Sequence, residues 1–284
     1  MFDYDTAFSR NVGWITESEK DIIKNTKIAI AGLGGAGGEH ALTLARMGFQ
    51  HFHFADFDEF EIHNFNRQAG AFTDTVERPK CTVMAEMVKK INPNITVKQF
   101  NDGVNDENVD EFFEGVDIYV DGIDFFALHA RLSVYRKAEE KGIPNLLAAP
   151  FGMGAAMAIF TPESMPFEQY YRFNDAKTDD EKFIKLLIGL GPALLQKSYL
   201  VDESTADFKE KKGPSTPMAI KLCSGMLVTN VLKLVLKRGD VIVAPKVQQF
   251  DAYKNKFVVS NSRWGTRGPL QRLKFKIAKA KVLK

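Results

Sequence analysis

The 284-residue chain has little cysteine and no long apolar run, and its first residues lack a basic segment followed by an apolar stretch. Cys81 and Cys223 are its only cysteines, which excludes a disulfide framework and a four-cysteine zinc site. The apolar stretch at residues 146–160 is broken by proline and glycine, and it is shorter than the roughly 20 residues that span a bilayer. The first residues do not resemble a secretory signal. We therefore expect a cytoplasmic protein without zinc and without a membrane partner.

Acidic residues are also absent from one end of the chain. Residues 267–284 contain seven basic residues and no acid, so the formal net charge of +2 leaves residues 1–266 with 31 − 36 = −5. A basic tail can attract nucleic acid or anionic lipid, and RNA is kept as a partner on this ground. The simpler interpretation is a solvated end, or a strand with one basic face in "LKFKI" (residues 273–277).

The body of the chain alternates between strand-like and helix-like segments. Strands are predicted around residues 27–32, 52–55, 95–100, 116–122 and 143–149, with helices between most of them. Such alternation predicts an α/β fold with a Rossmann-like, mostly parallel sheet and helices on both faces. Two β-rich runs around "DAYKN" (residues 251–255) predict a C-terminal antiparallel hairpin that extends the sheet.

Five segments follow from these patterns. We expect an N-terminal helical arm, in which Thr16 and Glu19 form a capping box, then a Rossmann-like region, a polar crossover loop, a helix with the hairpin that completes the same domain, and a basic tail. Their bounds are 1–25, 26–161, 162–217, 218–262 and 263–284.

A glycine-rich turn follows the first predicted strand. The glycines of "GLGGAGG" let the backbone approach a phosphate, which the N-terminus of the next helix favours: Gly32, Gly34, Gly35 and Gly37. Asp56 comes 22 residues after Gly34, where an acid suits a ribose hydroxyl. These residues fit NAD as well as ATP, and a glycine turn without a ligand stays open.

Polar and cationic residues after Asp56 separate the two nucleotides. Asn64, Asn66 and Arg67 follow it closely, and Lys80 opens the next helix. Asp121 and Asp124 lie at the end of a strand, where a magnesium ligand is expected. Hydride transfer changes no phosphate bond, whereas cleavage of ATP needs cations and a metal where charge develops. Three of these residues also have a structural alternative: Arg67 in a surface ion pair, Lys80 at a solvated helix start and Asp124 as an N-cap.

The motifs in this order resemble the E1-like adenylyltransferases of the ThiF/MoeB/HesA family. The resemblance covers most of residues 8–262 and is nearest to members sometimes fused to a nitroreductase-like module. It rests on "FSRNVGWIT", "IAGLGGAGG", "DFDEFEIHNFNRQ", "RPK", "INP", "VDGIDF" and "GPSTPMAIKLCSGMLVTNVLKLVLKRG".

The resemblance implies roles for individual residues. Gly35 and its neighbours would hold the phosphates, with Asp56 on the ribose and Asp58 beside it in the ATP site. Asn64, Arg67 and Lys80 would contact the triphosphate, and Asp124 would coordinate Mg²⁺. Arg10 would reach across a homodimer into the partner's site. The implied catalytic residues are therefore Arg10, Arg67, Lys80 and Asp124.

The implied reaction is the adenylation of a carboxylate, usually the C-terminus of a small ubiquitin-like protein or peptide, with release of pyrophosphate. This chain lacks the paired CxxC zinc motifs of many members, and no cysteine occurs between Cys81 and Cys223. Both cysteines fit packed core better than a nucleophile. We therefore expect transfer of the acyl group without an enzyme thioester. Phe125 stands where many members have asparagine after the magnesium aspartate.

Two other functions remain open. An NAD(P)-linked oxidoreductase would explain the glycines and Asp56 but would leave Arg67, Lys80 and Asp124 unused. A non-catalytic or tRNA-directed protein of the same fold would use the basic tail on RNA. The tyrosines of "EQYYRF" (residues 168–173) could grip a peptide, although packing of the crossover segment onto the sheet is the favoured interpretation.

Overall fold

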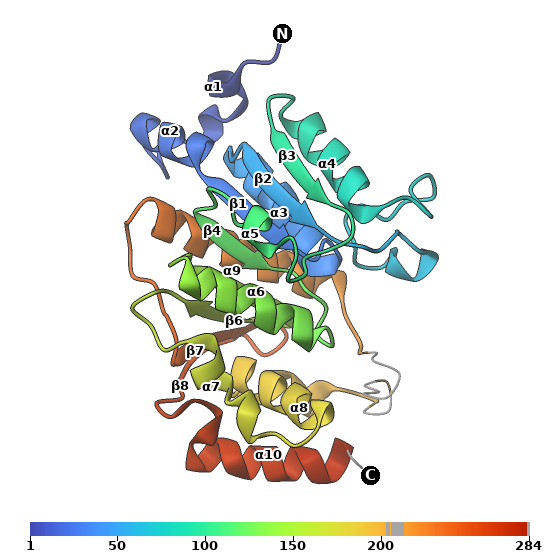
Figure 1. Cartoon of the computed structure of the whole chain (residues 1–284), viewed down its shortest axis with the longest axis vertical. Coiled ribbons are helices and arrows are strands. Elements are labelled where there is room, and N and C mark those ends of the chain that lie inside the picture. The colour runs from blue at the N-terminus through green and yellow to red at the C-terminus, as the bar shows by residue number, and fades with distance from the viewer. Residues whose placement is uncertain (203–204, 206–212, 283–284) are drawn as a thin grey trace.

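The computed structural model describes residues 1–202, 205 and 213–282, so parts of the crossover segment and the last two tail residues lie outside it. Its strands form one eight-stranded sheet in the order β3-β2-β1-β4-β5-β6-β7-β8 (Figure 1). The first five strands in this order pair in parallel, which confirms the predicted Rossmann-like sheet. They are β1 (Lys27–Ala31), β2 (His51–Ala55), β3 (Thr96–Phe100), β4 (Ile118–Asp121) and β5 (Asn145–Phe151).

The antiparallel part of the sheet is larger than the sequence predicts. β7 (Lys246–Asp251) and β8 (Lys256–Asn261) form the expected hairpin. However, β6 (Gly154–Phe160) already runs antiparallel to β5, and β7 pairs antiparallel to β6. The chain reverses at Gly152, whose φ of +64° is readily available only to glycine. Residues 146–160 are thus the predicted buried strand and turn, and together they make a second hairpin.

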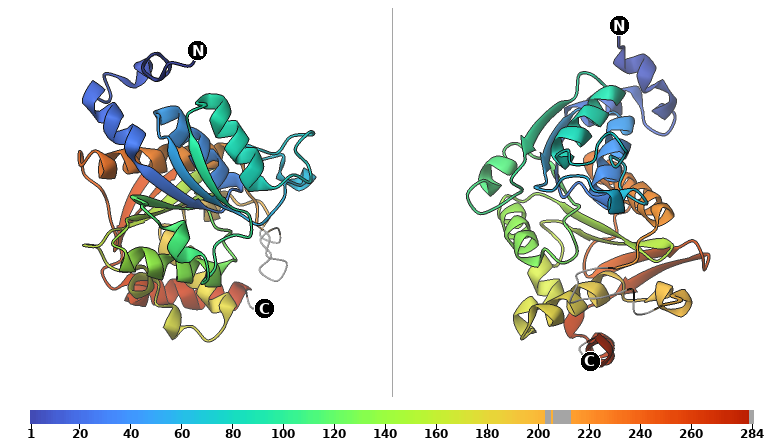
Figure 2. Two further views of the ribbon diagram at one scale, coloured as in Figure 1. Left: turned by 45° about the horizontal axis from the view of Figure 1, so that its top comes forward. Right: turned by 90° about the vertical axis from the view of Figure 1, so that its right-hand side faces the viewer.

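Helices cover both faces of the sheet, as predicted (Figure 2). Alternation along β1 shows why, because Ile28 and Ile30 enter one apolar core while Ala29 and Ala31 enter the other. The first core contains α3 (Gly35–Met47), α4 (Lys80–Ile91) and α9 (Pro217–Val235). The second contains α5 (Val109–Phe112), α6 (Leu128–Glu140), α7 (Phe167–Tyr171) and α8 (Asp179–Leu190).

One described helix, α9, is long and apolar enough to cross a membrane by length and composition alone. It packs on α3, β5 and β6, and its residues Cys223, Leu227 and Val231 are fully buried. A core helix meets the same criteria, and the contacts of α9 are those of a core helix.

The N-terminal arm consists of α1 (Tyr4–Ala7), the 3₁₀ turn η1 (Ser9–Asn11) and α2 (Glu17–Asn25). Thr16 and Glu19 form the predicted capping box at the start of α2. The arm is held at the C-terminal end of α3, where the Tyr4 hydroxyl donates to the Gly48 carbonyl oxygen at 2.9 Å.

The basic tail differs from its prediction. It is neither a solvated end nor a strand, because residues 269–282 form a helix, α10 (Pro269–Val282), which packs on α8. Lys279 pairs with Glu181 of α8, and the ammonium of Lys185 lies 5.6 Å from the Phe275 ring centroid. Short sequence windows such as "LKFKI" alternate as a strand would, but the contacts of the whole segment follow the helical period.

Candidate functional site

The predicted glycine turn joins β1 to α3 and lies against the end of β4. Gly32 has a φ of +83°, and a Cβ atom there would lie 2.2 Å from the Gly122 carbonyl oxygen. A Cβ at Gly37 would lie 1.8 Å from the Gly32 carbonyl oxygen. Both positions therefore require glycine. Gly34 precedes α3 and offers no capping side chain, which leaves the N–H groups of the first turn available to an anion.

Asp56 follows β2 and is bonded to this turn. Its Oδ2 accepts a hydrogen bond of 2.6 Å from the Leu33 amide, and its Oδ1 accepts one of 2.8 Å from the Asp58 amide. Burial raises the pKa of Asp56, while the charge of Lys80 and these two amides act to lower it. The carboxylate thus links the glycine turn to the segment that carries the other predicted site residues. Its contact with a ribose stays a prediction.

Lys80 starts α4 and places a buried ammonium beside Asp58. Its Nζ lies 2.9 Å from Asp58 Oδ2, and the Lys80 side chain is 7% exposed against 52% for that of Asp58. The solvated-helix-start alternative for Lys80 is therefore wrong. Because the carboxylate is the solvent-facing partner, an entering phosphate could take its place on the ammonium.

Arg67 lies next to the glycine turn. The nearest side chains to a Cβ built on Gly35 are Ile220 at 3.0 Å and Arg67 at 3.5 Å. The Nη1 atom of Arg67 donates to the His63 carbonyl oxygen at 3.0 Å and to Asn66 Oδ1 at 2.9 Å. These contacts fix the guanidinium without neutralising it, and Arg67 forms no ion pair with any residue that the structure describes.

The two asparagines before Arg67 have different surroundings. Asn64 is buried, and its Oδ1 accepts from the Glu61 amide at 3.0 Å, which closes the turn. Asn66 is exposed and donates through Nδ2 to the Ser215 carbonyl oxygen at 3.1 Å, which ties it to the end of the crossover segment. The structure thus shows structural contacts for both residues, and a triphosphate contact by Asn64 stays a prediction.

The two acids after β4 are not equivalent. Asp121 is buried, and Arg131 of α6 donates to it at 2.7 Å, so Asp121 is already paired. Asp124 is exposed, and its Oδ1 accepts from the Phe126 amide at 2.8 Å. It is not the N-cap of α6, which is Ala127. Asp124 is thus the acid of this pair that remains available to a metal.

A Mg²⁺ ion at this edge of the sheet would need the phosphates of a bound nucleotide as additional ligands. Among the described residues no group of three or more His, Cys, Asp or Glu side chains could hold a metal ion. Mg²⁺ in nucleotide sites is usually bound by one or two carboxylates, with phosphates and waters completing its shell. Asp124 could hold the ion in this way when a triphosphate is bound.

Arg10 does not lie at the glycine turn of its own chain. It is exposed in η1, and Asn11 beside it donates to the carbonyl oxygens of Arg46 and Met47 at the C-terminal end of α3. The glycine turn lies at the other end of this helix, which is about 20 Å long at 1.5 Å per residue. The structure therefore separates Arg10 from the other predicted site residues.

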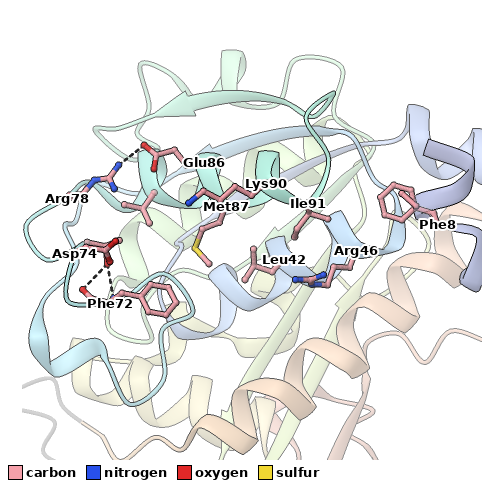
Figure 3. A pocket seen from close by; sticks show the side chains of 13 residues that line it. Phe8, Leu42, Arg46, Phe72, Asp74, Arg78, Glu86, Met87, Lys90 and Ile91 are labelled. Atoms are coloured by element: carbon pink, nitrogen blue, oxygen red, sulfur yellow. Dashed lines mark hydrogen bonds and ion pairs between the residues drawn. The ribbon is translucent and has the colours of Figure 1, made fainter. Parts of the chain in front are cut away.

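A groove also lies away from these residues. It has a volume of about 580 Å³ and runs between the arm, α3, α4 and the loop at 72–78 (Figure 3). Leu42, Met87 and Ile91 give it an apolar floor, and Arg46 and Lys90 lie at its side. None of the predicted site residues lines it.

Three side chains that the sequence does not single out make long-range contacts in the structure. Arg131 pairs with Asp121, Tyr199 donates to Asp251 at 2.6 Å while accepting from the Met153 amide, and Thr216 donates to the Gly152 carbonyl oxygen at 3.1 Å. Tyr199 and Thr216 thus both contact the β5–β6 turn. No local pattern signals these contacts, because their partners lie far away in the sequence.

The cysteines and the tyrosine pair are packed, as expected. Cys81 and Cys223 are fully buried, and burial raises the pKa of both thiols, to about 12 for Cys81. Tyr170 and Tyr171 are also fully buried, so they pack the crossover segment onto the sheet.

Comparison with known proteins agrees with the fold and the order of these motifs. The model of the ThiF family matches residues 8–268. The chain belongs to the ThiF family. Curated relatives of this ThiF-family chain include the tRNA threonylcarbamoyladenosine dehydratase of Bacillus subtilis, 31% identical over 52% of this chain and 57% of the relative, and the sulfur carrier protein ThiS adenylyltransferase of Escherichia coli, 28% identical over 51% and 56%.

A solved structure supports the same fold. The crystal structure of E. coli MccB with ATP has a TM-score of 0.63 and 21% identity, and the alignment covers 88% of this chain and 66% of MccB. The chain spans about half the length of the curated relatives it matches. The match establishes the family and the fold of this chain.

Proposed function

We propose that this chain is an ATP- and Mg²⁺-dependent adenylyltransferase that activates a carboxylate. The observation that carries the proposal is the placement of Asp56, Lys80 and Arg67 around the glycine turn. The Asp56 carboxylate is bonded to the turn itself, and the Lys80 ammonium is buried beside Asp58. Arg67 is held near Gly35 and has no acidic partner among the described residues. In a nicotinamide oxidoreductase, the positive charges of Lys80 and Arg67 would have no catalytic role.

In the proposed reaction, a carboxylate oxygen of the substrate forms a bond to the α-phosphorus of ATP. The bond between that phosphorus and the bridging oxygen to the β-phosphate breaks, and pyrophosphate leaves with both electrons of the broken bond. Lys80 and Arg67 stabilise the charge on the phosphoryl oxygens, and the glycine turn holds the phosphates. Mg²⁺ bound at Asp124 would supply further positive charge.

The proposal includes a homodimer in which Arg10 completes the site of the second copy. This part of the proposal is supported by the position of Arg10, which lies far from the glycine turn of the same chain. We also propose a cytoplasmic location, where ATP is available, and direct transfer of the acyl group without an enzyme thioester. The burial of both cysteines supports the last point.

The substrate is proposed to be the C-terminus of a small ubiquitin-like protein or peptide. A tRNA-directed reaction is the second candidate, favoured by the tRNA threonylcarbamoyladenosine dehydratases among the relatives and by the basic tail.

ATP–pyrophosphate exchange tests the proposal, with carboxylate peptides, ubiquitin-like proteins and tRNA added one at a time. Exchange that requires Mg²⁺ and one of these partners would support adenylation and identify the substrate class. Failure of the chain to bind ATP, or binding of NAD in its place, would overturn the proposal.

A further inference from the structure

Helix α10 lies at the opposite end of the molecule from the N-terminal arm and forms its outer edge (Figure 1). One side of α10 is attached to the body. Gln271 is buried, Lys274 donates to the Pro192 carbonyl oxygen, and Lys279 pairs with Glu181. These contacts fix which side of the helix faces outward.

The outward side carries an apolar stripe. Leu270, Leu273 and Ile277 are 61%, 54% and 48% exposed, and their i, i+3, i+7 spacing places them along one face of the helix. Trp264 is 63% exposed and lies just before α10, close to Gly268. Exposed aliphatic and indole side chains that gather in one region indicate a contact surface rather than scattered exposure.

Cations flank this stripe. Residues 252–284 contain ten basic residues and no acid, which leaves 28 − 36 = −8 for residues 1–251. On a helical projection, Arg272 and Lys276 lie on one side of the stripe and Lys274 on the other. Arg272 and Lys276 are exposed and form no ion pair with any described residue. A long basic side chain can extend its charge toward a polar boundary while its stem lies on apolar surface.

The charges exclude a second copy as the occupant of this face. Self-association along the stripe would bring the same basic residues of two α10 helices together, which repels. RNA would be attracted by the cations, but it offers no apolar layer for Leu270, Leu273 and Ile277. An outermost helix with an aliphatic stripe, a neighbouring tryptophan and flanking cations has the composition of a helix that lies in the plane of an anionic membrane interface.

We propose that α10, together with Trp264, binds the surface of anionic membranes. Leu270, Leu273 and Ile277 enter the boundary between headgroups and acyl chains, while Arg272 and Lys276 contact lipid phosphates. The expectation of no membrane partner rested on the lack of a spanning segment, and a helix that lies on the surface needs none. This inference goes beyond the adenylation site and is independent of it.

Cosedimentation of the full chain with vesicles tests the proposal. At low salt, the chain should bind vesicles of equal parts phosphatidylglycerol and phosphatidylcholine, and it should bind phosphatidylcholine vesicles at least about tenfold more weakly. The double variant Leu273→Ser/Ile277→Ser should lose at least about tenfold in binding to the mixed vesicles, because both apolar side chains leave the interface. Arg272→Gln/Lys276→Gln should lose about tenfold or more.

A matched control removes two charges far from α10. Lys89→Gln/Lys90→Gln alters exposed residues at the end of α4 and should bind the mixed vesicles like the wild type. The unfolding temperature of every variant is measured, and vesicle binding is compared among the variants that unfold at the same temperature as the wild type. The proposal would be overturned if the wild type did not bind vesicles, or if the serine variant bound them as well as the wild type does. It would also be overturned if the wild type bound tRNA through Arg272 and Lys276 and did not bind vesicles. The last result would assign the tail to RNA.

Discussion

Arg131 on α6 and Asp121 at the end of β4 form a buried ion pair beneath the turn that carries Asp124. The Nε atom of Arg131 lies 2.7 Å from Asp121 Oδ2, and the side chains are 2% and 0% exposed. The same guanidinium donates to the carbonyl oxygen of Ile123 at 2.5 Å. Arg131 therefore fixes the buried side of this turn, and Asp124 is the acid of the turn that faces solvent.

We predict that Arg131→Met lowers the free energy of unfolding by about 3–5 kcal/mol, because it leaves Asp121 buried without a partner. Urea unfolding followed by circular dichroism measures the loss. Arg136→Met on the same helix is the control. Arg136 is 62% exposed and pairs with Glu168, so its loss should cost no more than about 1 kcal/mol. Similar losses for both variants would contradict a supporting role for Arg131.

The sequence predicts the parts of this site that depend on local spacing. The glycine turn, Asp56 and Lys80 were predicted because each sits at a fixed offset from a strand or helix end. Arg131 was not, because nothing local distinguishes a buried arginine from a solvated one on a charged helix. Tyr199 and Asp251 were missed for a similar reason, since 52 residues separate them. The pairing of β6 with β7 also depends on a partner strand that residues 146–160 alone do not name.

We predict that Lys80→Met weakens ATP binding about tenfold to hundredfold, because the variant loses a buried charged donor to the phosphates. Isothermal titration calorimetry with ATP measures the change. Lys90→Met is a matched control at the exposed far end of α4 and should bind ATP like the wild type. Equal affinity of wild type and Lys80→Met would remove Lys80 from the site and leave its pair with Asp58 as a structural contact.

We predict that Asp124→Asn slows ATP–pyrophosphate exchange at least about a hundredfold at saturating Mg²⁺, since a charge that holds the metal is lost. Asparagine keeps an oxygen that can accept from the Phe126 amide, so the turn should survive. ATP binding without Mg²⁺ should therefore be unchanged, which separates loss of the metal from damage to the fold. Asp240→Asn, an exposed acid after α9, serves as the control for charge. Normal exchange by Asp124→Asn would refute a metal role for this residue.

We predict that Cys81 and Cys223 react slowly with a disulfide reagent at pH 8 in the folded chain and quickly in urea. Burial raises the pKa of Cys81 to about 12 and also raises that of Cys223, so very little thiolate is present at this pH. The double variant Cys81→Ser/Cys223→Ala should keep its acyl-transfer activity. Rapid labelling of either thiol in the folded chain, with loss of acyl transfer in the variant, would restore an enzyme thioester as an intermediate.

The last prediction concerns His40, which lies fully buried on α3. Burial lowers the pKa of His40 from 6.5 to about 3, so between these values the unfolded chain binds a proton that the folded chain does not. The free energy of unfolding should therefore fall as the pH falls below about 6.5, and the contribution of His40 should approach about 1.4 kcal/mol per pH unit. Urea unfolding midpoints measured at about pH 7, pH 6 and pH 5 give the slope of the unfolding free energy against pH.

His53 is also buried with a lowered pKa, so the wild type is compared with His40→Leu, which should have the shallower slope. If His40→Leu keeps the slope of the wild type, the folded chain must protonate His40 as readily as the unfolded chain does, and α3 must open to water at mildly acidic pH.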